Sequence, residues 1–124
     1  MNWRDLPSLT SLRAFAAAAE LEAPVFVHMR GANQTGGDLL APIQEVIANA
    51  LATGASLHIV HLNSSTDESA RPALALIRGA REAGLDITTE SYPYTAGSTL
   101  IESALFDNWQ SDYGLLQWAA TGER

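Results

Sequence analysis

Two histidines stand at the ends of two similar apolar runs, "APVFVHMR" and "SLHIVHLNSS". They are His28 and His61. Neighbouring parallel strands lie about 4.8 Å apart, so two imidazoles that leave such strands on one side can reach a single metal ion at the usual Zn–N distance of about 2.0–2.1 Å. Zinc polarises carbonyl groups and lowers the pKa of bound water to about 7, which is the chemistry of metal-dependent hydrolysis. The alternative is that each histidine is a structural residue at a strand end.

A third histidine, His58, lies three residues before His61 in the same run. Odd spacing along a strand turns two side chains to opposite faces. If His61 faces a site, we therefore expect His58 to face the helices, where it would be packed and hydrogen-bonded and not a ligand. A catalytic zinc normally takes three protein ligands, so the pair of His28 and His61 predicts only part of a metal site.

The hydrophobic pattern supplies strands on which these histidines can lie side by side. We predict a helix from about Ser8 to Glu22, with Ser8 as its cap. Strands are expected in "PVFVHM", "SLHIVHL" and "LDITTESYPY", and the first is apolar enough to be buried on both faces. Helices are expected in "DLLAPIQEVIANALATG" and "NSSTDESARPALALIRGAREAG". The order α-β-α-β-α-β predicts an α/β fold with a parallel sheet.

Turn residues mark the ends of the two later helices. Asp38 is the expected cap of the first, Gly54 its terminator, and Gly84 the terminator of the second. Helical spacing places four apolar side chains of the first on one face, namely Leu40, Ile43, Ile47 and Leu51.

Composition narrows the function classes. The chain has 124 residues and a formal net charge of −7, and its seven basic residues are scattered arginines. No basic stripe follows a phosphate backbone, so we expect no nucleic-acid partner. No apolar run approaches the roughly 20 residues of a membrane span, and the start lacks the order of a secretory signal. The chain has no cysteine, which excludes thiolate ligands and is compatible with the cytoplasm.

Several segments together resemble one family. They are "APVFVHMR", "DLLAPIQEVI", "LHIVHLNSS", "GLDITTESYPYTAGST" and "LQWAATGER", in that order from about Ala23 to Arg124. The chain is similar to the amidohydrolase superfamily, in the branch that includes N-acyl-D-amino-acid deacylases (D-aminoacylases). The resemblance implies a (β/α)8 barrel with a zinc centre at its C-terminal mouth. It implies that His28 and His61 are metal ligands at the ends of the fifth and sixth strands, and that zinc-activated water attacks a linear amide of a small N-acyl amino acid or related substrate.

The resemblance also assigns residues to the substrate. Arg30 is expected to reach an anionic group, or else to remain solvated in its loop. Tyr92, Tyr94 and Ser98 are expected to line the acyl or carboxylate pocket, or else to pack around the turn at the neighbouring proline. Glu90 is either an acid behind the site or a paired structural carboxylate.

Departures from the family pattern indicate a partial chain. A barrel of this type needs about 250 residues, and no "HxH" pair, bridging ligand or eighth-strand aspartate base is present; Asp107 and Asp112 are not in that context. We expect a fragment with roughly strands 5 to 7, divided into a helix (1–22), a βαβαβ core (23–94) and a loop or lid segment (95–124). Alone it is expected to be inactive, and to be poorly soluble or oligomeric, since two sheet edges stay unpaired.

Two alternatives to the hydrolase interpretation remain. One is a non-catalytic α/β ligand-binding module, although "RGANQTGGD" matches neither "GxxxxGK[ST]" nor "GxGxxG". The other is a truncated paralogue that acts as an interaction piece, with its histidines as relics.

Overall fold

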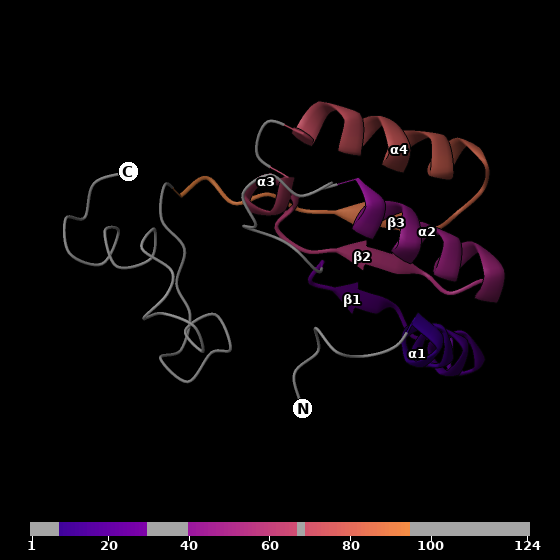
Figure 1. Cartoon of the computed structure of the whole chain (residues 1–124). Coiled ribbons are helices and arrows are strands. Elements are labelled where there is room, and N and C mark those ends of the chain that lie inside the picture. Colours follow the sequence, from indigo (N-terminus) through magenta and orange to yellow (C-terminus); the bar gives the residue numbers. More distant parts are fainter. Residues whose placement is uncertain (1–7, 30–39, 67–68, 95–124) are drawn as a thin grey trace, which may run out of the picture. The chain divides into compact units, whose positions relative to one another are not determined.

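The computed structural model describes residues 8–29, 40–66 and 69–94. In these ranges the chain forms α1 (Ser8–Glu20), β1 (Val25–Val27), α2 (Ala41–Thr53), β2 (Leu57–Ile59), α3 (Leu62–Thr66), α4 (Ala70–Glu82) and β3 (Ile87–Thr89) (Figure 1). The described residues up to Pro93 belong to one compact unit, and Tyr94 belongs to a second. No helix in these ranges is both long and apolar enough to cross a membrane.

The three strands form one parallel sheet in the order β1-β2-β3. The predicted α/β fold with a parallel sheet is therefore confirmed for the described residues. Paired positions form three rows across the sheet: Val25 with Leu57 and Ile87, Phe26 with His58 and Thr88, and Val27 with Ile59 and Thr89. This register brings the carboxyl ends of all three strands to the same edge.

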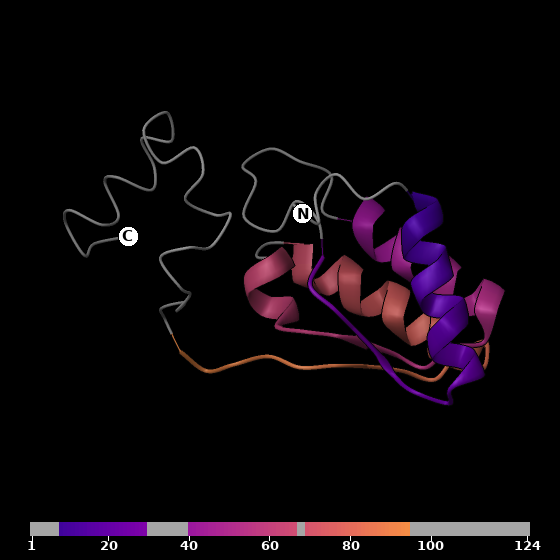
Figure 2. The ribbon, with the colours of Figure 1, turned by 90° about the horizontal axis from the view of Figure 1, so that it is seen from below.

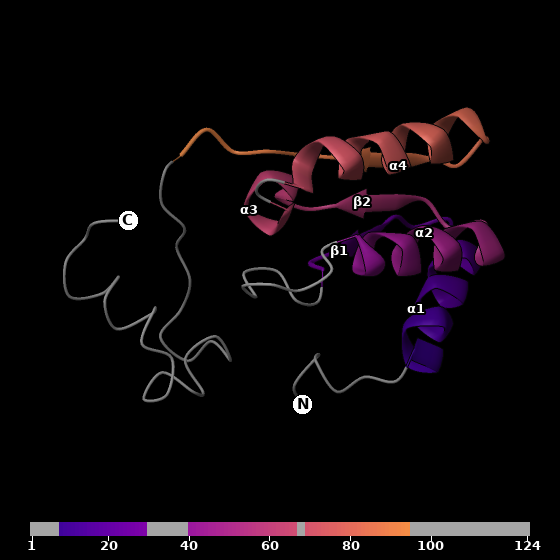
Figure 3. The same ribbon diagram turned by 45° about the horizontal axis from the view of Figure 1, so that its top comes forward.

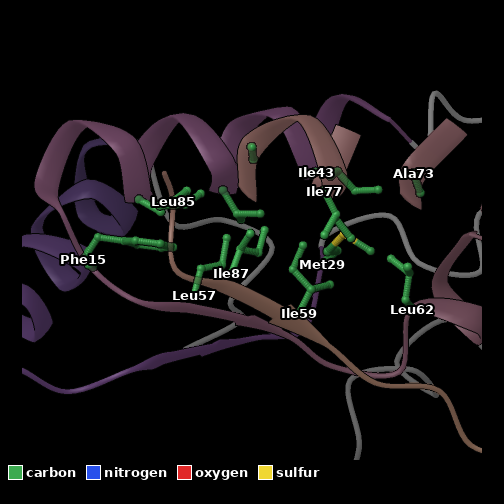
Figure 4. Packing of buried hydrophobic residues seen from close by; sticks show 14 residues of the cluster. Phe15, Met29, Ile43, Leu57, Ile59, Leu62, Ala73, Ile77, Leu85 and Ile87 are labelled. Carbon is green, nitrogen blue, oxygen red and sulfur yellow. The ribbon is translucent and has the colours of Figure 1, made fainter. Parts of the chain in front are cut away.

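Helices cover one face of this sheet. Figures 2 and 3 show α2 and α4 lying along the same side of the strands. Strand residues Leu57, Ile59 and Ile87 point into this layer and are 2%, 0% and 1% exposed (Figure 4). They meet Ile43 of α2 and Ile77 of α4, both buried in the same cluster. Burial of each such side chain contributes about 1.5–3 kcal/mol, so this layer is the main source of stability.

The opposite face of the sheet carries no helix of the described unit (Figure 2). Phe26 lies there with 67% of its surface exposed, so the expectation that the first strand is buried on both faces is wrong for this unit. The reason is topological. Crossovers between parallel strands are right-handed, and two crossovers that advance in the same direction place their helices on the same side.

The first helix, α1, ends at Glu20, two residues before the predicted end at Glu22. Glu22 has a φ of 52°, which lies outside the helical region. The amide of Ala23 donates to the carbonyl of Ala18 at 2.9 Å, and that of Glu22 to the carbonyl of Ala19 at 3.1 Å. These two bonds are the pattern of a Schellman motif, here with glutamate in the position that glycine usually takes.

The later helices differ in detail from the prediction. Leu40 and not Asp38 is the cap of α2, without a side-chain hydrogen bond, and Asp38 lies outside the described residues. Gly54 ends α2 as expected, with a φ of 74°. The buried row of α2 is Ile43, Val46 and Ala50, whereas Leu51 is 53% exposed. The segment after β2 forms two helices, α3 and α4, where the sequence predicts one.

Candidate metal centre

His28 and His61 leave the sheet at the carboxyl ends of adjacent strands. His28 directly follows β1, and His61 follows β2 after one residue. Backbone bonds extend the pairing beyond the strands, since the amide of Val60 donates to the carbonyl of Val27 at 3.1 Å. His61 then adopts a φ of 37°, which turns the chain sharply into α3. Histidine is among the residues that tolerate this left-handed region better than others.

The two imidazoles face one another. Nδ1 of His28 lies 2.6 Å from Nε2 of His61, and the ring centroids are 4.7 Å apart with the planes inclined at 43°. At this distance one ring donates its N–H to the lone pair of the other, so the pair holds one shared proton between these two nitrogens. The predicted convergence of His28 and His61 from neighbouring parallel strands is present in the structure.

The surroundings of His28 favour its neutral form. Burial of the ring is the larger cause and the positive charge of a protonated His61 the smaller, and together they lower the pKa of His28 below its ordinary value of 6.5. The imidazole of His28 is therefore neutral at pH 7, which is the form that binds metals. Because the pKa is lower in the folded chain than in the unfolded one, the unfolded chain binds more protons as the pH falls below 6.5. Stability from this group is complete above that pH and is lost as the pH falls toward the folded pKa.

An NMR titration of the His28 ring checks this order of causes. We expect a pKa below 6.5 in the wild-type chain and a partial rise in His61→Gln, because the substitution removes the smaller cause and leaves burial in place. His58→Gln is the control, since it removes a different histidine from the same sheet. A complete return to 6.5 in His61→Gln would show that repulsion and not burial dominates.

His58 lies on the face of the sheet that the helices do not cover, so its predicted orientation is wrong. Its strand neighbours Leu57 and Ile59 are buried under the helices, which turns His58 to the other side. The alternation of faces holds only within β2, which ends at Ile59, and does not extend to His61. The expectation that His58 is packed and hydrogen-bonded is confirmed. Its Nδ1 lies 2.7 Å from Oγ1 of Thr88, and its ring centroid lies 4.9 Å from that of Phe26.

Glu90 lies between His58 and His61. Its Oε1 accepts a bond from the amide of His61 at 3.4 Å, and its Oε2 is 3.9 Å from Nε2 of His58. The carboxylate thus contacts the main chain of one histidine and the ring of another. Glu90 therefore links His58, on the uncovered face of the sheet, to His61 beyond the carboxyl end of β2.

The structure describes only some of the other predicted site residues. The Tyr92 ring centroid is 6.4 Å from that of His61, so Tyr92 does lie beside the pair. Arg30 and Ser98 lie outside the described residues, and Tyr94 belongs to the second unit. Within residues 8–29, 40–66 and 69–94 no group of three or more histidine, aspartate or glutamate side chains is placed to hold a metal. The described residues thus offer a pair of ligands.

Sequence reasoning missed Asn63, which is bound to the backbone of Tyr92. Its Nδ2 donates to the carbonyl of Tyr92 at 3.0 Å, and its Oδ1 accepts from the amide of Tyr92 at 3.3 Å. The available signal was a polar residue two positions after His61, shortly past the end of β2 at Ile59, since the ends of parallel strands are where ligand sites form.

Comparisons of the chain with protein-family models, with curated proteins and with solved structures found no match.

Proposed function

We propose that this chain is part of a metal-dependent hydrolase that cleaves linear, non-peptide amide bonds, with His28 and His61 as two ligands of a zinc ion. In this proposal β1, β2 and β3 correspond to roughly strands 5 to 7 of a (β/α)8 barrel. The observation that carries it is the 2.6 Å approach of Nδ1 of His28 to Nε2 of His61. It is supported by the position of both residues at the carboxyl ends of parallel strands, where barrel enzymes place their catalytic groups.

The donor set of this pair fits zinc. Imidazole nitrogen is a preferred ligand of Zn²⁺, and the lowered pKa of His28 keeps its ring neutral at pH 7. Two nitrogens on a tetrahedral zinc are separated by about 3.3 Å, which is more than the 2.6 Å between these two. The rings therefore have to separate by less than one ångström. A side-chain rotation achieves this. The proton between the two nitrogens then has to move to the other nitrogen of its own ring, because each ligand nitrogen must present its lone pair to the metal.

Each residue of the site has a role in this proposal. His28 Nδ1 and His61 Nε2 hold the metal, and the Tyr92 ring beside His61 forms one wall next to it. A bound zinc supplies a Lewis acid that polarises a carbonyl and makes water acidic. The third ligand and the aspartate that moves the proton are expected from residues other than these. The chain by itself is therefore not expected to hydrolyse N-acyl amino acids.

Calorimetric titration of the untagged chain with Zn²⁺ tests the proposal. We expect about one equivalent to bind in the micromolar range, because two preformed imidazole ligands supply part of a zinc site. Mg²⁺ is the matched control, since it prefers carboxylate, carbonyl and water oxygens and is not expected to bind to a pair of imidazoles. Zinc binding that is absent, or no tighter than that of Mg²⁺, would contradict the proposal.

A further inference from the structure

The chain segments that follow β2 and β3 remain paired after the strands themselves end. His61 turns the first segment into α3, while the second continues from Glu90 through Tyr92. The last backbone bond between them runs from the amide of Leu62 to the carbonyl of Glu90, at 2.9 Å. After this bond the backbone of α3 follows its helix and leaves the segment that contains Tyr92. The amide and the carbonyl of Tyr92 lie beyond this last bond, on a residue that is half-buried.

Asn63 bonds both of these backbone groups. The amide of its side chain holds a donor and an acceptor in one plane, and these engage the carbonyl of Tyr92 at 3.0 Å and its N–H at 3.3 Å. The side chain thus replaces one residue of a β-ladder. An aspartate offers only acceptors, and an alanine offers neither group. Pro93 also restricts the backbone of Tyr92, because a residue before proline is confined to extended conformations. In such a conformation the amide and the carbonyl of Tyr92 can both face Asn63.

We propose that Asn63 is a positioning residue that fixes the Tyr92 ring beside His61. Its two bonds set the backbone of Tyr92, and the ring then lies with its centroid 6.4 Å from that of His61 and its plane inclined at 44°. The role of this ring as a wall of a metal site rests on the proposed function, but its placement by Asn63 does not. Without Asn63 the Tyr92 backbone loses both of these bonds, and we expect the ring to lose its fixed orientation.

The metal-free chain provides the first test, by NMR. We expect a nuclear Overhauser effect between the rings of Tyr92 and His61 in the wild-type chain, and its loss in both Asn63→Ala and Asn63→Asp. Asn63→Asp has nearly the shape of the native residue and serves if the alanine variant does not fold. Asn49→Ala is the matched control, because Asn49 also uses its side-chain amide, to bond Ser11 at 3.1 Å between α2 and α1. An effect that persists in the Asn63 variants, or is lost equally in Asn49→Ala, would overturn the proposal.

Titration with Co²⁺, a paramagnetic substitute for zinc, separates this inference from the proposed function. Loss of a hydrogen bond to a metal ligand costs about tenfold in metal affinity. In Asn63→Ala we expect a smaller change in the affinity for Co²⁺, since the two bonds of Asn63 run to the backbone of Tyr92. The broadening of the Tyr92 ring signal by Co²⁺ is expected to fall several-fold. If the wild-type chain does not bind Co²⁺, the proposed function fails, while the metal-free measurement still decides the role of Asn63. If broadening is unchanged in Asn63→Ala, the positioning role is refuted.

Discussion

Replacing either His28 or His61 with alanine is expected to weaken zinc binding by about 100-fold or more. The loss of a group that only supports a ligand already costs about 10- to 100-fold, and each of these substitutions removes a ligand itself. The geometry leaves no substitute among the described residues, because no cluster of three potential ligands includes either ring. Calorimetric titration of each variant beside the wild-type chain measures the effect.

His58→Ala is the control that the chain itself offers. His58 is also an imidazole of the same sheet, but its Nδ1 is engaged with Thr88 at 2.7 Å and its ring packs on Phe26. We expect zinc affinity to remain within about threefold of the wild-type value in this variant, below the roughly 10-fold cost of losing a group that supports a ligand, because the two nitrogens of His58 face Thr88 and Glu90 and not a ligand ring. Binding that survives in His28→Ala, or that disappears in His58→Ala, would move the metal away from the His28–His61 pair and contradict the proposed site.

The convergence of His28 and His61 could be predicted because it depends on topology alone. Two similar apolar runs separated by one helix indicate neighbouring parallel strands, and parallel strands end at a common edge. The register then places the two ring nitrogens 2.6 Å apart. No side-chain contact had to be known for this prediction, only the order of elements and the position of each histidine at the end of its run.

The orientation of His58 could not be obtained in the same way, because it depends on where β2 ends. Counting alternate faces from His61 gives the wrong side, since Val60 and His61 have already left the strand and His61 has a φ of 37°. Counting from the buried neighbours Leu57 and Ile59 gives the right one. Strand ends are set by tertiary pairing, which a run of apolar letters does not reveal.

The role proposed for Asn63 could not be predicted from the sequence, for a related reason. Its partners are the backbone groups of Tyr92, whose identity depends on the register between the segments after β2 and β3. The exposure of Phe26 was hidden as well, because an apolar strand looks the same whether one face or both faces are covered. Both features belong to the assembled sheet and not to any one segment.

Ile59→Ala is expected to destabilise the chain by about 2–5 kcal/mol, the usual cost of truncating a buried isoleucine. Ile59 lies on the central strand of the sheet, on its helix-covered side, with 0% of its surface exposed. Small domains are stable by only about 5–15 kcal/mol, so the substitution removes a large part of the total. Urea denaturation followed by circular dichroism measures it. Ile59→Val, with an expected cost of about 0.5–1.5 kcal/mol, provides a graded value if the alanine variant does not fold.

Phe26→Ala is the comparison for Ile59→Ala, because Phe26 lies on the opposite face of the same sheet. It removes more atoms than Ile59→Ala, but Phe26 is 67% exposed and its ring centroid lies 4.9 Å from that of His58. We therefore expect a cost of about 1 kcal/mol or less. If Phe26→Ala costs as much stability as Ile59→Ala, another surface must bury Phe26 in solution. In that case the cost should decrease when the chain is diluted if a second copy provides the cover, because only association depends on concentration. The two substitutions therefore distinguish a sheet with one buried face from a sheet whose second face is closed by association.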